Sequence, residues 1–146
     1  MFLVVDANIL IGELLRKRGQ EIILNPMLTL YVSERVFSEA NYELDKRVNF
    51  MIQQKRLTQN EGKKRLGDAK LIVESLNMVI FSDYQHLENH AKNLIPRDLN
   101  DWETVAISIL LDVDIWTKDS DFIGCGRATW TTDTLIYLIN ANLLTI

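Results

Sequence analysis

The sequence predicts an α/β fold built on a parallel sheet. Short apolar segments of strand type alternate along the chain with segments of helical periodicity, which is the pattern of a sheet covered by helices. One such segment, Phe2–Val5, runs directly into Asp6, and another, residues 114–117, leads into Lys118 and Asp119. Because ligands of open parallel sheets bind at the carboxyl ends of the strands, we expect these two strands to lie side by side, with both aspartates in one site.

The composition indicates one globular domain. A chain of 146 residues has the commonest size of a single domain, so we expect residues 1–146 to form one unit. Hydrophobic residues make up 47% and charged residues 25%, which argues against a disordered or fibrous chain. No apolar run approaches the length of about 18 residues that a membrane span needs, and the chain begins with a strand instead of a leader. We therefore expect a cytoplasmic protein that does not associate with a membrane.

A helix is expected over residues 8–18, after the first strand. The basic run Arg16–Arg18 complements the negative end of its dipole, and Gly19 is placed to stop it. Residues 28–32 are mostly apolar and include β-branched side chains, which predicts a second strand. Ser33 follows this strand and suits the N-cap of the next helix.

Two long helices are expected to form a hairpin at about residues 34–76. The first keeps one apolar stripe through about residue 56. Thr58 and Glu61 have the spacing of a capping box, which predicts that the second helix begins there and continues to about residue 76.

The next part of the chain predicts a strand over residues 78–81 and a short helix over residues 83–93. A helix over residues 105–111 is apolar nearly all round, so it must be largely buried. Asn100 and Glu103 are spaced to cap its start, which places Asp101 in the first turn, near the positive end of the helix dipole.

The end of the chain predicts two strands and a helix. Residues 114–117 form the strand that leads to Asp119, and residues 128–130 form a short last strand. Thr132 or Asp133 is expected to cap a final helix that ends at about residue 142.

Positive charge is concentrated in the predicted hairpin, although the formal net charge of the chain is -4. Lysines and arginines outnumber the two acidic residues between positions 46 and 70 several-fold. A basic face beside an acidic site is typical of a metal-dependent enzyme that acts on a polyanion, whereas a plain solvated helix face would look the same. The candidate RNA-binding residues are Lys46, Arg47, Lys55, Arg56, Lys63, Lys64 and Arg65.

Three carboxylates are candidates for a metal site. Asp6 and Asp119 close two strands, and Asp101 opens the buried helix. A single aspartate at a strand end more often caps a helix or a turn. Three of them at one edge favour a cation, because like charges packed together are costly and because Mg²⁺ prefers oxygen ligands.

The sequence resembles the PIN domains over essentially its whole length. Each motif that carries the resemblance is short, but their order and their positions on the predicted elements agree. The motifs are Asp6 with Asn8, Glu39 within Ser38–Ala40, Asp101 within Asp98–Trp102, and Asp119 with Asp121 within Ile115–Phe122.

The resemblance implies a three-layer α/β/α sandwich with a central parallel sheet of four or five strands in the order 3-2-1-4-5. It also implies that Asp6, Glu39, Asp101 and Asp119 hold one or two Mg²⁺ or Mn²⁺ ions and catalyse hydrolysis of RNA phosphodiester bonds. Asp98 and Asp121 are further candidate ligands, while Asn8 and Thr117 would orient the carboxylates. Glu39 is preferred to Glu43 because it lies closer to the helix start.

The resemblance extends to toxin ribonucleases of the VapC kind, which implies a homodimer and a cognate antitoxin protein. A different function class is a catalytically silent PIN-like module that binds RNA or a protein through the basic hairpin. A phosphoacceptor fold also places an aspartate after its first strand. However, Asn8 stands where one such group needs a second aspartate, which argues against it.

Overall fold

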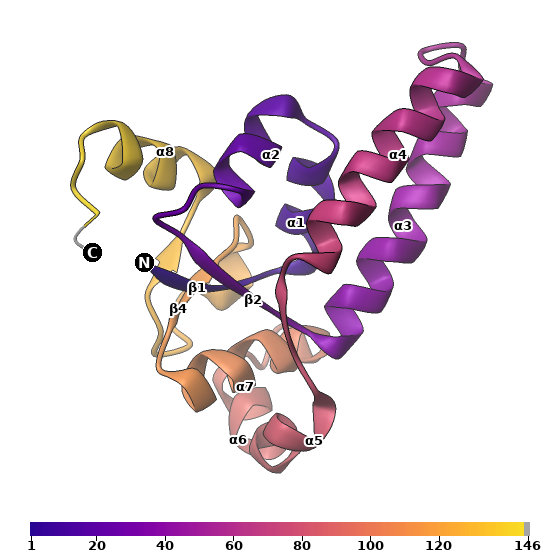
Figure 1. Ribbon diagram of the computed structural model, residues 1–146. Coiled ribbons are helices and arrows are strands. Elements are labelled where there is room, and N and C mark those ends of the chain that lie inside the picture. Colours follow the sequence, from indigo (N-terminus) through magenta and orange to yellow (C-terminus); the bar gives the residue numbers. More distant parts are fainter. Residues whose placement is uncertain (145–146) are drawn as a thin grey trace.

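The computed structural model describes residues 1–144 and consists of a parallel sheet with helices on both faces (Figure 1). Within these residues the sheet has five strands in the order β3-β2-β1-β4-β5, and every neighbouring pair is parallel. The predicted fold class and strand order are therefore confirmed, including the placement of β1 beside β4. The strands are β1 (Phe2–Val5), β2 (Thr29–Ser33), β3 (Asn77–Val79), β4 (Asp114–Trp116) and β5 (Thr129–Trp130).

The helices alternate with these strands along the chain. They are α1 (Ala7–Leu14), α2 (Lys17–Ile23), α3 (Glu34–Gln53), α4 (Gln59–Glu74), α5 (Phe81–Tyr84), α6 (Glu88–Leu94), α7 (Trp102–Leu111) and α8 (Thr132–Asn140). Three short 3-10 turns complete the set: η1 (Gln85–Leu87), η2 (Leu99–Asp101) and η3 (Ser120–Phe122). Among the described residues, none of the helices combines the length and the apolar character needed to cross a membrane.

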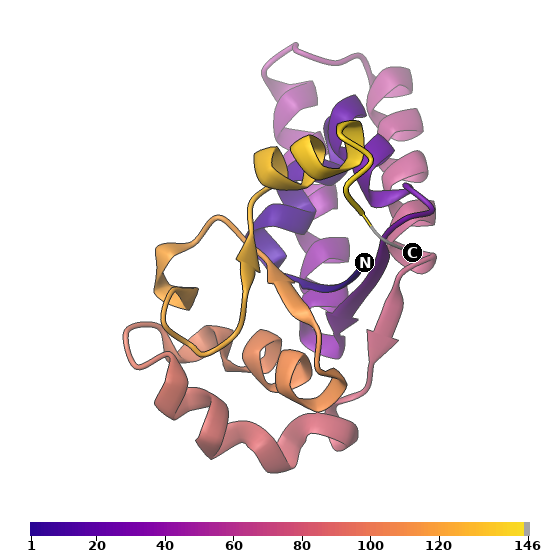
Figure 2. The same ribbon diagram turned by 90° about the vertical axis from the view of Figure 1, so that its left-hand side faces the viewer.

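The sheet separates two hydrophobic cores because successive side chains of a strand point to opposite faces. Leu3 and Val5 of β1 are buried in the core that includes residues of α1, α3 and α8. Val4, which lies between them, is buried in the second core with residues of α7. Figure 2 shows the same division, with α1 and α8 on one side of the strands and α6 and α7 on the other.

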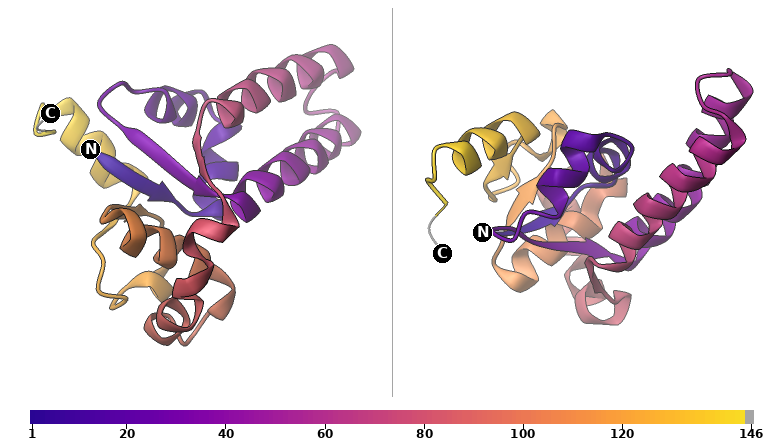
Figure 3. Two further views of the ribbon diagram at one scale, coloured as in Figure 1. Left: turned by 60° about the horizontal axis from the view of Figure 1, so that its bottom comes forward. Right: turned by 45° about the horizontal axis from the view of Figure 1, so that its top comes forward.

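Helices α3 and α4 form the predicted hairpin. The backbone N–H of Val36 donates to the hydroxyl of Ser33 at 2.9 Å, and that of Glu61 donates to the hydroxyl of Thr58 at 3.1 Å, so both predicted caps are confirmed. Figure 3 shows the two helices extending together away from the sheet. The start of α3 therefore lies at the carboxyl edge of the sheet, whereas the turn of the hairpin lies far from it.

The helix predicted over residues 8–18 is wrong, because the chain forms two helices there. Helix α1 ends at Leu14, and Gly19 lies inside α2 instead of stopping a helix. A Cβ on Gly19 would lie 2.2 Å from the carbonyl oxygen of Glu13, so the residue is a glycine because two helices touch at this point. Sequence reasoning mistook a packing requirement for a stop signal.

The cap predicted at Asn100 is also wrong. Helix α7 begins at Trp102, and Asp101 occupies its N-cap position without a side-chain cap hydrogen bond. The side chain of Asp98 instead accepts from the backbone N–H of Asn100 at 3.0 Å, which stabilises the turn η2. The carboxylate of Asp101 is therefore not used by its own helix.

Smaller differences concern three other predicted elements. The strand predicted to reach Phe81 ends at Val79, and the helix predicted over residues 83–93 consists of α5, η1 and α6. Helix α8 is capped by Thr131, in a capping box with Thr134, and not by either predicted residue. The differences concern where elements begin, end or are interrupted, because backbone hydrogen bonds at these points depend on neighbours that local periodicity does not describe.

Candidate active site

Asp6 and Asp119 lie side by side at the carboxyl edge of the sheet. Asp6 follows β1 directly, and its backbone N–H donates to the carbonyl oxygen of Trp116, the last residue of β4, at 3.0 Å. The strand pairing sets Val5 opposite Trp116, so the residues after both strands emerge together. The structure thus brings together the two aspartates that the sequence placed at neighbouring strand ends.

Thr117 connects these two aspartates. Its hydroxyl donates to Oδ2 of Asp6 at 3.0 Å and accepts from the backbone N–H of Asp119 at 3.0 Å. Both Thr117 and Asp6 are only 2% exposed, so this hydroxyl orients a buried carboxylate. That Thr117 orients a metal-binding carboxylate stays a prediction.

Asp98 and Asp101 approach from the other side of the edge, on the segment that leads into α7. One carboxylate oxygen from each of Asp98, Asp101 and Asp119 lies within 4.8 Å of the others. We refer to Asp6, Asp98, Asp101 and Asp119 as the acidic cluster.

Burial, together with neighbouring negative charges, raises the pKa of two of these groups. Burial, followed by the charges of Asp6 and Asp98, raises the pKa of Asp101 to about 6, against an ordinary value of 3.8. Burial also raises the pKa of Asp6, an effect that the hydrogen bond from Thr117 opposes and the charge of Asp119 increases. The cluster is therefore poorly compensated by the protein itself, which is a property of cation sites.

Arg35 is the cation nearest to the cluster that the structure records, and sequence reasoning missed it. Its guanidinium lies 4.0 Å from Oδ1 of Asp101 and 3.2 Å from Oε1 of Glu103, and it donates to the carbonyl oxygen of Asn100 at 2.6 Å. Arg35 lowers the pKa of Asp101, although burial and the neighbouring carboxylates outweigh it. The contacts span more than sixty positions of the chain, so no local pattern could reveal them.

Glu103 and Tyr84 form a buried brace behind Arg35. The hydroxyl of Tyr84 donates to Oε2 of Glu103 at 2.6 Å, and Tyr84 is fully buried. Burial and the charge and hydrogen bonding of Glu103 raise the pKa of Tyr84, which keeps the phenol protonated. Glu103 therefore holds Arg35 in place and is not a member of the acidic cluster.

Glu39 lies beside the cluster instead of within its tight group of oxygens. Its carboxylate is 4.0 Å from the guanidinium of Arg35, one helical turn earlier on α3, and its side chain is 40% exposed. Glu43, the alternative considered from sequence, lies near Lys46 and Arg47 at 3.7 and 3.9 Å. Glu39 is thus connected to Asp101 through Arg35, whereas Glu43 belongs to the outer part of the hairpin.

Asp121 and Asn8 occupy less central positions. The carboxylate of Asp121 is 3.3 Å from Nε of Arg97, and its backbone N–H donates to Oδ1 of Asp119 at 2.9 Å. Asn8 is exposed on the first turn of α1. Asp121 therefore has a structural partner, while the side chain of Asn8 faces solvent beside the cluster.

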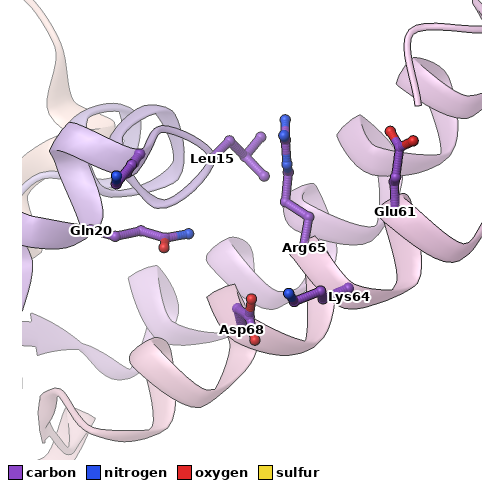
Figure 4. Close-up of a pocket in the computed structure, with 7 residues that line it drawn as sticks. Leu15, Gln20, Glu61, Lys64, Arg65 and Asp68 are labelled. Atoms are coloured by element: carbon purple, nitrogen blue, oxygen red, sulfur yellow. The ribbon is translucent and has the colours of Figure 1, made fainter. Parts of the chain in front are cut away.

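The candidate RNA-binding residues lie on the outer part of the hairpin. Lys64 and Arg65 of α4 line a hollow of about 320 Å³ together with Leu15 and Gln20. Figure 4 shows Arg65 and Leu15 extending toward each other across this hollow. A helix rises about 1.5 Å per residue, so the end of the 20-residue α3 lies roughly 30 Å from its start at the acidic cluster.

The acidic cluster fits a hard divalent cation. Mg²⁺ takes oxygen ligands at about 2.1 Å, so oxygens on opposite sides of one ion are about 4.2 Å apart. Small rotations of the half-buried carboxylates of Asp98, Asp101 and Asp119 would close the separation of up to 4.8 Å between their oxygens. Such an ion would also offset the burial and the repulsion that raise the pKa of Asp101.

A comparison with protein families gives one match, the family model described as PIN domain, which covers residues 4–139. No curated protein matches the chain. The matched range includes β2 to β5, the second half of β1 and every residue of the acidic cluster.

Proposed function

The chain belongs to the PIN-domain family, which consists generally of nucleases, and from this premise we propose that it is a metal-dependent ribonuclease. The observation that carries the proposal is the convergence of four aspartates from three segments of the chain at the carboxyl edge of the sheet, where Arg35 only partly compensates the charge around Asp101. The positive charge of the hairpin supports a polyanionic substrate.

Asp6, Asp101 and Asp119 would hold one or two Mg²⁺ or Mn²⁺ ions, with contributions from Asp98 and Glu39. The chemistry that such an ion supplies when bound is activation of a water molecule and neutralisation of charge at the phosphate. Thr117 holds the carboxylate of Asp6 in one orientation through its hydroxyl.

Arg35 limits the repulsion around Asp101 and fixes the position of the segment that carries it. The basic residues of the hairpin would bind the RNA backbone beyond the scissile bond. Because they lie up to about 30 Å from the cluster, an RNA that contacts both must extend over several nucleotides.

The test of this proposal is an Asp119→Asn variant of the full chain, assayed for cleavage of a labelled RNA with Mg²⁺ or Mn²⁺. We expect the rate to fall at least about a hundredfold, because a charged ligand is lost while the side-chain shape is kept. Isothermal titration calorimetry should show a parallel loss of divalent-ion binding.

The matched control is Asp45→Asn, which makes the same chemical change on the hairpin, where Asp45 pairs with Lys70. This variant should keep both cleavage and metal binding. Undiminished cleavage by a folded Asp119→Asn protein would contradict the proposal.

We further propose that the protein is a cytoplasmic toxin of a toxin-antitoxin pair, acting as a homodimer and silenced by a cognate antitoxin. Membership of the PIN-domain family and the resemblance to toxin ribonucleases support this proposal. Induced expression should arrest growth, and Asp119→Asn should relieve the arrest. Light scattering on the purified protein tests the dimer.

A catalytically silent module that binds RNA through the hairpin is the second candidate. It is favoured by the length of the hairpin and by the position of its positive charge away from the acidic cluster. Retained RNA binding without detectable divalent-ion binding would favour this candidate over the enzyme.

A further inference from the structure

Two segments of the chain carry three of the four aspartates of the acidic cluster. We call residues 97–101 the η2 segment and residues 117–121 the η3 segment, after the 3-10 turns that overlap them. Asp98 and Asp101 lie on the first segment and Asp119 on the second, and one carboxylate oxygen of each lies within 4.8 Å of the others. The separation of the two segments therefore sets the separation of these carboxylates.

Each segment is anchored to a different part of the fold. The η3 segment is tied to the end of β1, because the hydroxyl of Thr117 donates to Oδ2 of Asp6 and accepts from the backbone N–H of Asp119, each at 3.0 Å. The η2 segment is tied to α3, because the guanidinium of Arg35 donates to the carbonyl oxygen of Asn100 at 2.6 Å. Neither anchor joins the two segments to each other.

Arg97 makes the polar contacts between the two segments. Its Nη2 donates to the carbonyl oxygen of Ser120 at 2.8 Å, and its Nε lies 3.3 Å from Oδ1 of Asp121. Within residues 1–144, no other hydrogen bond or ion pair joins the η2 segment to the η3 segment. The flanking residues Ile95 and Phe122 are buried in the same hydrophobic core, so the remaining contact is apolar.

The contacts of Arg97 continue to a carboxylate of the acidic cluster. The backbone N–H of Asp121, the residue that pairs with Arg97, donates to Oδ1 of Asp119 at 2.9 Å. On the other side, Asp98 is the next residue of the chain after Arg97. Among the described residues, Arg97 forms no ion pair with an aspartate of the cluster itself. Its guanidinium therefore links the two sides of the cluster without neutralising either of them directly.

The spacing of the carboxylates matters for a divalent ion. In the absence of an ion, their mutual repulsion favours separation of the two segments. Mg²⁺ binds its oxygen ligands at short and nearly fixed distances, so a wider separation would weaken its binding. The side chain of Arg97 is 61% exposed, and an exposed ion pair contributes little to the stability of a fold. The effect of Arg97 is therefore expected on the geometry of the cluster and not on folding.

We propose that Arg97 is a positioning residue for the divalent ion of the acidic cluster. It holds the η2 segment against the η3 segment, so that the carboxylates on both segments are close enough to share one ion. Arg97 contacts neither the ion nor the RNA. This inference rests on the proposed function for the metal site, but it does not require that RNA is cleaved.

The test is isothermal titration calorimetry of Mg²⁺ and Mn²⁺ into the full chain with Arg97→Gln. This variant removes a positive charge near a cation site, so electrostatics alone would strengthen ion binding. A positioning role predicts the opposite result, a loss of affinity of about 10- to 100-fold, as for other groups that orient metal ligands. Unchanged or tighter binding by the variant would overturn the proposal.

Two further variants separate geometry from charge. Arg97→Lys keeps the positive charge but lacks the planar fork that makes both contacts, so it should recover only part of the lost affinity. The matched control is Arg18→Gln, because Arg18 is similarly exposed, at 59%, and pairs across two segments, α2 and α8, that carry no aspartate of the cluster. This control should bind the ions as tightly as the unmodified chain. Full recovery of affinity by Arg97→Lys would show that charge alone matters and would contradict the proposal.

Stability and kinetics distinguish a positioning residue from a structural or a catalytic one. The urea midpoint of metal-free Arg97→Gln should stay close to that of the unmodified chain. Cleavage of a labelled RNA by this variant should be slow at low Mg²⁺ and should recover when Mg²⁺ saturates the site. A rate that stays low at saturating Mg²⁺ would indicate that Arg97 contacts the substrate, which contradicts the proposal.

Ion binding and cleavage together separate this inference from the proposed function. If Arg97→Gln binds Mg²⁺ more weakly than the unmodified chain but neither protein cleaves RNA, the ribonuclease proposal fails and the role of Arg97 stands. If RNA is cleaved and the two proteins bind Mg²⁺ equally, the positioning role fails and the ribonuclease proposal stands.

Discussion

Two buried glutamates on opposite faces of the sheet differ in how their charge is satisfied. Glu103 of α7 is 7% exposed and has Tyr84 on one oxygen and Arg35 on the other. Glu13 of α1 is 5% exposed and receives one hydrogen bond, from Thr132. Their burial is almost equal, so the difference in partners, and not the difference in solvent access, distinguishes the two regions.

The two arrangements have different physical consequences. A buried carboxylate with a cation and a hydroxyl is a structural brace, and removal of one partner leaves the others uncompensated. A buried carboxylate with an unfilled acceptor costs about 1–3 kcal/mol relative to a filled one. Glu103 therefore stabilises the fold around the acidic cluster, whereas Glu13 keeps one buried oxygen without a hydrogen bond among the described residues.

The largest expected effect comes from the glycine that packs on Glu13. Gly19→Ala would place a Cβ 2.2 Å from the backbone oxygen of Glu13, and neither backbone can yield easily. We expect a loss of about 3 kcal/mol or more in the free energy of unfolding, measured by urea denaturation.

Gly67→Ala is the matched control for this change. Gly67 lies inside α4, and a Cβ there would meet nothing within 4 Å. Alanine is the better helix former, so this variant should gain about 0.5–1 kcal/mol. Equal stability of the two variants would mean that the contact between α1 and α2 does not constrain the chain.

Glu103→Gln tests whether the contacts of Glu103 stabilise the fold. It removes the ion pair with Arg35 and weakens the hydrogen bond from Tyr84, so the free energy of unfolding should fall by about 2 kcal/mol. Tyr84→Phe removes the hydroxyl alone and should cost about 1 kcal/mol. An unchanged urea midpoint for Glu103→Gln would contradict the assignment of a brace.

The acidic cluster between the two glutamates gives a pH dependence. The pKa of Asp101 is about 6 in the folded chain and 3.8 ordinarily, so the folded state binds this proton more tightly than the unfolded state. The stability of the metal-free protein should therefore fall as the pH rises from about 4 to about 6, by roughly 1–3 kcal/mol, and this contribution should then level off.

Asp101→Asn should remove this part of the pH dependence and stabilise the metal-free protein at pH 7. Addition of Mg²⁺ should raise the unfolding temperature of the unmodified protein more than that of the variant, because the ion binds only the folded cluster. If the stability of both proteins depended on pH in the same way, the raised pKa of Asp101 would not be the cause of this pH dependence.

The smallest expected effect belongs to Glu13→Gln. This variant removes a charge that forms no ion pair within residues 1–144, so we expect a change within about 1 kcal/mol, toward higher stability. The comparison with Glu103→Gln sharpens the distinction, since the same chemical change should have opposite signs at the two sites. A larger loss at Glu13 than at Glu103 would reverse the roles assigned to them.

Local sequence was sufficient for most elements and for the acids at strand ends. Ser33 and Thr58 cap the helices that their spacing predicted, because a cap hydrogen bond joins residues three positions apart. Asp6 and Asp119 could be placed together because parallel strands end at one edge, and the family resemblance supplied the strand order.

Arg35, the brace at Glu103 and the incomplete pairing of Glu13 could not be found in this way. Arg35 reaches Asn100 across 65 positions, and Thr132 reaches Glu13 across 119. The same applies to Gly19: the sequence predicted that it stops a helix, whereas in the structure it allows close contact with Glu13.

The sequence by itself determined which residues end the strands and carry the carboxylates, because hydrophobic periodicity and capping are properties of neighbouring positions. The tertiary structure alone decided which of the buried charges are compensated. Compensation depends on distances of a few ångströms between residues far apart in the chain, and only the packing of the helices on the two faces of the sheet sets those distances.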